Sequence, residues 1–259
     1  DVTTFHGPPI DSPQKFSFAK WFSPRLRAWR EMERQELILS SPQLIISVSI
    51  LIRDQLTLMY PELKGQAHIV APPGVQESMS VAKYKYIKNE KGCGRRCLFV
   101  GKEWKRKGLL LAIEVVRSYR ERSGVDASLT VYGLEAHEVP ANFRIYDWLV
   151  FKGWSANIEW FDYDILIHPA QNEPFGMVIT EARANGLPVL MSDQVGARDL
   201  HLKSTEVIGL DAPISVWASR LASLLDRGFH EVEVKWSWAD LIAMHRDQIY
   251  PSIIPRVFE

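Results

Sequence analysis

The sequence is poor in several features that would assign it to a specialised class of protein. Only two of its 259 residues are cysteine, too few for a disulfide framework or a four-cysteine zinc site. Its 31 basic and 31 acidic residues cancel, so no overall field favours nucleic acid or an anionic membrane. No apolar run reaches the roughly 18 residues that a membrane-spanning helix needs. We therefore expect a cytoplasmic protein that does not bind nucleic acid.

Two common nucleotide-binding motifs are also absent. The sequence contains no G-x-G-x-x-G after a strand, which argues against a Rossmann oxidoreductase, and no G-x-x-x-x-G-K-[ST] of a P-loop. The remaining composition is ordinary, with 46% hydrophobic and 24% charged residues, and the length suits one large or two small domains. Because the strand-like pattern begins at once with Val2–Phe5, we expect a piece of a longer protein.

One stretch, residues 164–193, predicts a strand, a polar loop, a helix and a second strand in succession. The apolar run 164–167 feeds the loop, a helical pattern runs from about Gly176 to Asn185-Gly186, and 187–191 is apolar again. This unit is the building block of a parallel sheet. Its loop lies at the carboxyl end of a strand, where open α/β sheets bind ligands.

Two glutamates within this stretch are eight residues apart. Glu173 lies in the loop and Glu181 within the helix. Two carboxylates beside a helix start, whose free N–H groups suit a phosphate, fit a ligand that carries hydroxyls next to a phosphate. A loop glutamate plus a solvated helix glutamate is the ordinary alternative for such a pair taken alone.

A second strand, 97–100, leads into a basic loop before the helical pattern 109–121. Lys102, Lys105, Arg106 and Lys107 place four positive charges within six residues. A diphosphate would relieve their mutual repulsion through lysine point charges and an arginine fork. The alternative is a solvated basic turn.

Strands and helices alternate on both sides of a polar, basic segment, which predicts two Rossmann-like layers. We assign 1–75 to a partial N-terminal domain, 76–96 to a linker, 97–243 to a C-terminal domain, and 244–259 to a tail that packs back on the first domain.

The run from Glu173 to Val189, E-P-F-G-x-V-x-x-E-A-x-A-x-G-L-P-V, resembles the signature of family 4 retaining glycosyltransferases. The basic loop is similar to the family's donor-diphosphate loop at Gly101, Lys107 and Gly108, although Lys102 stands where arginine is usual. Arg106-Lys107-Gly108 resembles the corresponding loop of lipopolysaccharide core glucosyltransferases.

The resemblance implies an α/β protein of the GT-B fold, with two Rossmann-like domains facing a cleft and an incomplete N-terminal domain. It implies that Glu181 binds the ribose hydroxyls of a nucleoside diphosphate sugar, and that Glu173 binds the transferred sugar. The implied catalytic residues are Glu173, His6, Arg106 and Lys107, and the implied donor-binding residues are Gly101, Lys102, Phe175, Gly176, Met177 and Glu181. No metal and no cofactor are expected.

The leading hypothesis is a retaining hexosyltransferase that uses a UDP-sugar such as UDP-glucose. Its acceptor would be a saccharide or lipid-linked saccharide, as in polysaccharide or lipopolysaccharide biosynthesis. The basic region 83–96 would contact the inner face of the membrane peripherally. A non-catalytic sugar-nucleotide-binding module, or an inactive fragment of a glycosyltransferase, is the alternative.

Overall fold

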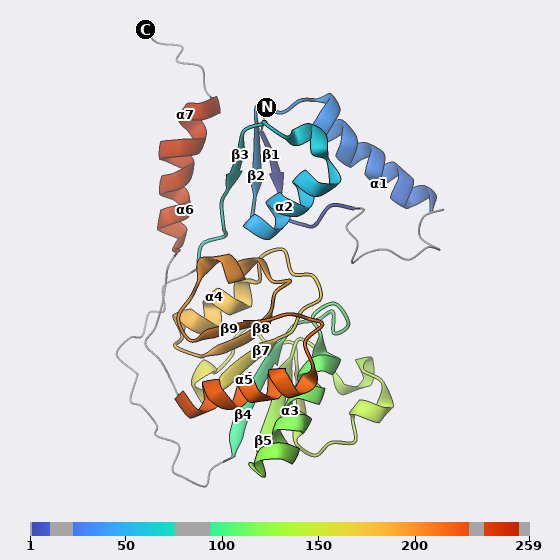
Figure 1. Cartoon of the computed structure of the whole chain (residues 1–259), viewed down its shortest axis with the longest axis vertical. Coiled ribbons are helices and arrows are strands. Elements are labelled where there is room, and N and C mark those ends of the chain that lie inside the picture. Colours follow the sequence, from blue (N-terminus) through green and yellow to red (C-terminus); the bar gives the residue numbers. More distant parts are fainter. Residues whose placement is uncertain (1, 11–22, 76–93, 228–235, 254–259) are drawn as a thin grey trace. The chain divides into compact units, whose positions relative to one another are not determined.

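The computed structural model describes residues 2–10, 23–75, 94–227 and 236–253, and they form two compact units (Figure 1). Unit 1 comprises Asp1–Gly74 and Trp236–Glu259, and unit 2 comprises Val75–Lys235. No helix among the described residues is long and apolar enough to cross a membrane.

Unit 1 contains a three-stranded parallel sheet in the order β1-β2-β3. Ser49 caps the helix after the second strand by accepting a hydrogen bond from the amide of Ile52 at 3.2 Å. Its elements are β1 (Val2–Phe5), α1 (Pro24–Arg34), β2 (Leu44–Ser47), α2 (Ile50–Met59), β3 (His68–Val70), α6 (Trp238–Met244) and α7 (Tyr250–Ile253), with π-helical turns at Gln35–Leu39 and His245–Ile249.

Unit 2 is built on a six-stranded sheet in the order β6-β5-β4-β7-β8-β9, and every neighbouring pair of its strands is parallel. Its longer elements are β4 (Arg95–Val100), α3 (Leu109–Ser123), β5 (Ala127–Tyr132), β6 (Leu149–Gly153), β7 (Ile165–His168), α4 (Met177–Ala184), β8 (Val189–Ser192), β9 (Thr205–Ile208) and α5 (Ile214–Arg227).

The strand order of unit 2 reverses between β4 and β7. The chain first winds outward from β4 through β5 to β6, then returns to the other side of β4 and winds outward through β7, β8 and β9. In open α/β sheets, ligands bind beyond the carboxyl ends of the strands where the order reverses. The two loops that meet at this point are those following β4 and β7.

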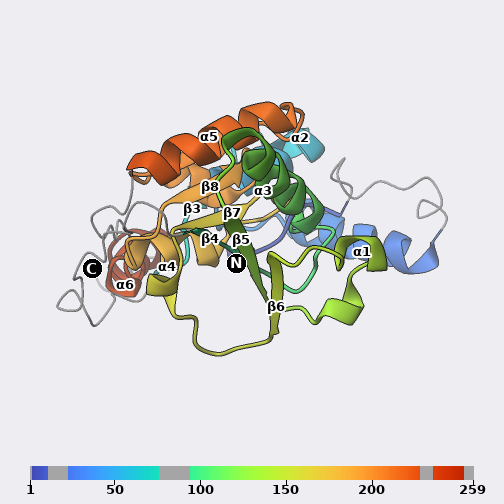
Figure 2. The ribbon, with the colours of Figure 1, turned by 90° about the horizontal axis from the view of Figure 1, so that it is seen from below.

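Helices α3 and α5 cover one face of this sheet, and α4 covers the other (Figure 2). Alternate strand residues, among them Phe99, Val131 and Ile167, join Ile113 of α3 and Trp217 of α5 in one core whose members are almost fully buried. Helix α4 packs instead on β7 and β8 from the opposite side. Burial on both faces explains why these strands are continuous apolar runs in the sequence.

Residues 236–243 differ from the predicted domain assignment, which placed them in the C-terminal domain. They belong to unit 1. The Trp236 indole donates a hydrogen bond to the Pro72 carbonyl at 2.6 Å, and Leu241 packs on a small core around Leu44 and Ile249. The indole bond and this apolar contact hold the segment on unit 1.

The predicted linker, residues 76–96, extends into the first strand of unit 2. Residues 76–93 lie outside the described residues, whereas Arg95 and Arg96 already belong to β4. The amide of Arg96 donates to the carboxylate of Asp164 at 2.7 Å, so polar side chains begin this strand at the amino edge of the sheet.

Helix α1 and the π-helical turn after it bury few of their apolar side chains. Met32 and Leu39 are both 64% exposed, and Leu37 is the one apolar side chain of these two elements that is fully buried. Glu33 is buried because its carboxylate accepts hydrogen bonds from the amide of Ile10 and the hydroxyl of Tyr60.

Leu221→Ala should remove a fully buried anchor of α5 and lower the free energy of unfolding by about 3 kcal/mol. Val216→Ala on the same helix is the matched control, because Val216 is 39% exposed and should cost under about 1 kcal/mol. Urea denaturation followed by tryptophan fluorescence measures both. Equal costs would contradict the packing of α5 described above.

Candidate functional site

The candidate site lies at the strand-order reversal of unit 2, where the loop after β4 touches the loop after β7. The amide of Gln171 donates to the carbonyl of Arg106 at 2.8 Å. Gly108 has a φ of +77°, and a Cβ there would lie 2.0 Å from the carbonyl oxygen of Pro169. Only glycine allows this approach, which brings the basic loop against the loop that carries Glu173.

The four cations of the basic loop separate into different environments. Arg106 and Lys107 turn toward Glu173, whereas Lys105 lies over the ring of Trp104 at 5.0 Å and Lys102 is exposed. The prediction grouped them as one charge cluster. The structure shows that a carboxylate of the chain itself neutralises two of them.

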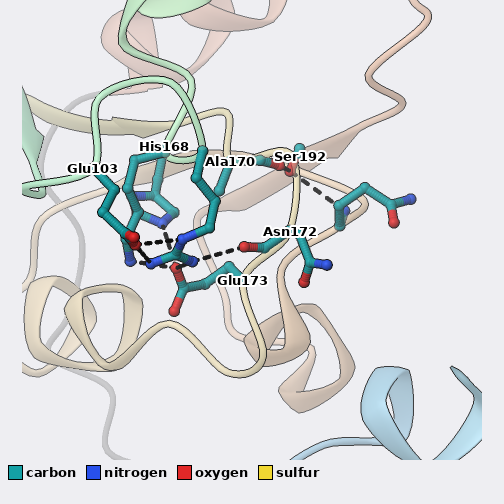
Figure 3. Close-up of polar contacts among 9 residues, drawn as sticks. Glu103, His168, Ala170, Asn172, Glu173 and Ser192 are labelled. Carbon is teal, nitrogen blue, oxygen red and sulfur yellow. Dashed lines mark hydrogen bonds and ion pairs between the residues drawn. The ribbon is translucent and has the colours of Figure 1, made fainter. Parts of the chain in front are cut away.

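Glu173 is the centre of the polar contacts (Figure 3). Its Oε2 accepts a hydrogen bond from Arg106 Nη1 at 3.1 Å and another from Lys107 Nζ. Arg106 also donates to the carbonyl of Asn172 at 2.8 Å and pairs with Glu103. Burial raises the pKa of the Glu173 carboxyl, but His168 and Lys107 outweigh it, and the net pKa is about 2. The carboxylate is therefore ionised at neutral pH.

His168, the last residue of β7, is fully buried next to this carboxylate. Its Nε2 lies 3.9 Å from Glu173 Oε2, and its ring stacks on Phe99 with centroids 6.4 Å apart. Burial lowers its pKa, and the charge of Lys107 lowers it further, so the ring is neutral at pH 7. The sequence analysis missed this residue. The sequence feature that could have identified it is a polar side chain at the end of an apolar strand, immediately before the Glu173 loop.

The backbone of the Glu173 loop is held by a segment that follows β8. The amide of Glu173 donates to the Gln194 carbonyl at 2.9 Å, and that of Gly196 returns a bond to the Glu173 carbonyl at 3.0 Å. The amide of Ala197 donates to the carbonyl of Phe175 at 2.7 Å. These bonds position the loop independently of its side chains.

Helix α4 begins directly after this loop. Gly176, its N-terminal cap, has a φ of +93°, and a Cβ there would approach Val195 Cγ1 to 2.9 Å. Met177 and Val178 occupy the first positions of the helix, where helical geometry offers their amides no intrahelical partner, whereas the amide of Ile179 donates to the carbonyl of Gly176 at 2.9 Å. Glu181 is half-buried in the same helix, and burial raises its pKa. Its carboxylate forms no hydrogen bond or ion pair with any residue that the structure describes.

Three glycines end the neighbouring strands β4, β5 and β6. Gly101, Gly133 and Gly153 all have positive φ angles, and Gly133 donates to the Gly153 carbonyl at 2.7 Å. A Cβ on Gly133 would lie 3.0 Å from the carbonyl carbon of Gly101. The absent side chains let the chain pack closely on itself here, because a Cβ on Gly101 would lie 2.9 Å from Lys107 Cγ and one on Gly153 would lie 2.1 Å from Glu135 Oε1. The sequence analysis named Gly101 but not the other two.

His6 and an aspartate pair are not among the residues that form this cluster. His6 follows β1 in unit 1 and is exposed. Asp164 forms an Asp-x-Asp triplet with Asp162, but it precedes β7, at the edge of the sheet opposite the carboxyl ends. In the parts of the chain that the structure covers, no three His, Cys, Asp or Glu side chains are placed to share a metal ion.

The fold matches that of GT-B glycosyltransferase structures. Residues 82–205 match the family model described as glycosyl transferases group 1, and this segment contains every site residue of unit 2. The resemblance to family 4 glycosyltransferases and the α/β GT-B fold predicted from the sequence are thereby confirmed.

Individual relatives resemble parts or most of the chain. EpsF of Bacillus subtilis (strain 168), named as a glycosyltransferase, is 36% identical over 61 residues, which is 23% of this chain and 16% of EpsF. WaaG, a glycosyltransferase involved in lipopolysaccharide biosynthesis, has a similar structure, with a TM-score of 0.71 and 20% identity over 96% of this chain and 70% of WaaG. The sucrose-phosphate synthase of Thermosynechococcus elongatus has a TM-score of 0.63 and 17% identity, covering 96% of this chain and 67% of the synthase.

The low pKa of Glu173 predicts a pH-dependent contribution to stability. A pKa of about 2, below the ordinary 4.5, means stabilisation that is complete above pH 4.5 and disappears as the pH falls through 2. The advantage of the wild type over Glu173→Gln in free energy of unfolding should shrink by about 3 kcal/mol between about pH 6 and about pH 2. Urea denaturation at each pH measures it. Glu121→Gln, an exposed glutamate on α3, is the control, and an equal pH dependence for both variants would refute the contribution of Glu173.

Proposed function

We propose that the chain is part of a retaining glycosyltransferase that moves a hexose from a nucleoside diphosphate sugar, with UDP favoured, to a saccharide or lipid-linked saccharide. The convergence of Arg106, Lys107 and Glu173 at the strand-order reversal is the observation that supports it most directly. Cations suited to a diphosphate and a carboxylate suited to sugar hydroxyls lie within contact of one another there.

The donor would lie along this edge of unit 2. Arg106 and Lys107 would bind the diphosphate and neutralise the charge that develops as it leaves. The amides of Phe175, Gly176 and Met177 would face phosphate or sugar at the start of α4. Glu181, whose carboxylate has no partner among the described residues, would accept hydrogen bonds from the ribose hydroxyls.

The proposed reaction assigns no protein base. The departing phosphate takes the acceptor proton, attack comes from the side of the leaving group, and the anomeric configuration is retained. Glu173 is ionised and held by two cations, which suits binding of the transferred sugar rather than proton donation. Lys102 and Gly101 complete the donor loop, and His6 of unit 1 remains a proposed catalytic residue.

Catalysis without a metal ion or cofactor is also part of the proposal, and it is supported by two cationic side chains, paired with Glu173, that could neutralise a diphosphate instead. Peripheral membrane contact in the cytoplasm, through the basic region 83–96, is proposed from its composition.

A non-catalytic sugar-nucleotide-binding module is the second candidate. The chain spans 70% of WaaG and matches a segment of only 16% of EpsF, so an activity that needs the remaining parts is a separate question from donor binding. Binding and turnover therefore need separate measurements.

Nucleotide binding should raise the melting temperature. UDP at a hundred times its Kd adds about 2.7 kcal/mol, or roughly 5–10 °C for a chain of this size, and EDTA should not change the shift. Glu181→Ala should weaken UDP binding about tenfold or more, because it removes a charged hydrogen-bond acceptor, whereas Glu121→Ala should not. A panel of UDP, GDP, ADP, CMP and TDP identifies the base. No shift with any of them would contradict the donor site.

Transfer should depend on Glu173 more strongly than binding does. Glu173→Ala should lower the turnover of a UDP-sugar by about a hundredfold, because the sugar loses its carboxylate contact, while UDP binding is kept or tightened by the freed cations. Nucleotide release in the presence of saccharide acceptors measures turnover. Binding of UDP without turnover would favour the non-catalytic module, and negligible effects of both glutamate variants would overturn the assignment.

A further inference from the structure

Three side chains surround a single carboxylate oxygen, Glu173 Oε2. Two of them come from the loop after β4, and the third comes from the end of β7. Lys107 Nζ and Arg106 Nη1 donate hydrogen bonds to it, and His168 Nε2 lies 3.9 Å away on its buried side (Figure 3). The side chain of Glu173 is only 11% exposed and that of His168 is not exposed at all. Solvent therefore screens this cluster weakly.

His168 is unusual because both of its ring nitrogens are buried without a hydrogen-bond partner among the described residues. Buried polar atoms are normally paired, since leaving one unpaired costs free energy. The ring stacks on Phe99 and faces three charged groups, Glu173, Lys107 and Arg106. It is aimed at Glu173 but stands just beyond hydrogen-bond distance of it.

Diphosphate binding, which rests on the proposed function above, would disturb this arrangement. Arg106 and Lys107 cannot give all their donors to a diphosphate and also keep their present bonds to Glu173. Each hydrogen bond that they transfer from Glu173 to the ligand is lost by the carboxylate. A carboxylate that is 11% exposed and loses its cations is an uncompensated buried charge, which is strongly unfavourable.

We propose that His168 is a positioning residue: when a diphosphate draws Lys107 and Arg106 away, its imidazole takes up a proton and pairs with Glu173 in their place. The proton comes from solvent, and no other bond forms or breaks. The new imidazolium contact keeps the carboxylate ionised and oriented while the cations serve the ligand. Donor binding is thereby coupled to the uptake of one proton.

The direction of this coupling follows from the charges around the ring. At present burial and the two cations favour the neutral imidazole, and Glu173 alone favours the charged form. Loss of Lys107 from the cluster removes a repulsive charge and leaves Glu173 less neutralised. Both changes raise the pKa of His168. A histidine that does not pair with Glu173 would respond only to the lost repulsion of Lys107, to the same extent with or without the Glu173 carboxylate.

The first test needs no ligand. The protonation of His168 is followed by NMR of ¹⁵N-histidine-labelled protein, assigned with His168→Asn. Lys107→Met should raise the pKa of His168 by about 1 or more, because an opposite charge within about 4–6 Å is no longer neutralised. The same Lys107→Met change made in a Glu173→Gln background should give a clearly smaller rise, because only the loss of the lysine's own repulsion then remains.

Lys105→Met is the matched control, since Lys105 belongs to the same loop but lies over Trp104. It should leave the His168 titration unchanged. An unchanged titration in Lys107→Met, or an equally large rise when Glu173→Gln is present in both proteins compared, would overturn the proposal.

The second test begins with the unaltered protein, whose own result does not depend on the folding of a variant. Calorimetric titration of UDP in buffers of different ionisation enthalpy should show uptake of one proton near pH 7, which His168→Asn should abolish without abolishing binding. Binding without proton uptake by the wild type would refute the role of His168 and leave the proposed function intact. Absence of UDP binding would refute the proposed donor site, and the NMR titration would still decide the role of His168.

Discussion

The site depends on the reversal of strand order between β4 and β7. Because parallel strands present their carboxyl ends at one edge, this reversal brings the loops after β4 and β7 together although they are more than sixty residues apart in the chain. Gly108 allows the two loops to approach each other closely, since a side chain at this position would collide with the carbonyl of Pro169. Without that approach, the cations of one loop would not reach Glu173 in the other.

Once the loops are in contact, electrostatics determines the local arrangement. A carboxylate as buried as Glu173 is tolerated only with partners, and Arg106 and Lys107 supply them. The same two cations are the groups that a diphosphate would need. The ligand-free site is therefore self-neutralised, and any anion that binds there competes with a carboxylate of the chain. This competition separates Arg106 and Lys107 from Lys105 and Lys102, which the amino-acid order alone presents as equivalent.

Much of the second unit could be predicted from its sequence because its strands are buried on both faces. Apolar runs such as 97–100 and 187–191 mark the strands, and Asn185-Gly186 marks the end of α4. The beginning of β4 was missed because Arg95 and Arg96 lie at the amino edge of the sheet, where polar residues are tolerated.

Other features depend on contacts distant in sequence and left little local signal. The helix at 25–40 has a helical period, but which of its apolar residues are buried is decided by tertiary contacts, and Met32 is exposed. Residues 236–243 were assigned to the wrong domain because no local pattern reveals that Trp236 bonds to Pro72. His168 was overlooked for a related reason. A polar residue at a strand end is usually a boundary, and only the fold shows that this one is buried against Glu173.

The two glutamates of the central motif illustrate how similar residues acquire different properties. Both are withdrawn from solvent, and burial raises the pKa of each carboxyl. For Glu181 that effect stands, because no described side chain pairs with it. For Glu173 the neighbouring His168 and Lys107 reverse it. One carboxylate is thus already paired with partners within the chain, and the other has its acceptors unfilled.

A ligand with hydroxyls meets no competing side chain at Glu181, whereas at Glu173 it must bind together with an anion that takes over the two cations. The proposed roles therefore differ in their dependence on the diphosphate. Nucleoside recognition at Glu181 does not require it, whereas sugar recognition at Glu173 does.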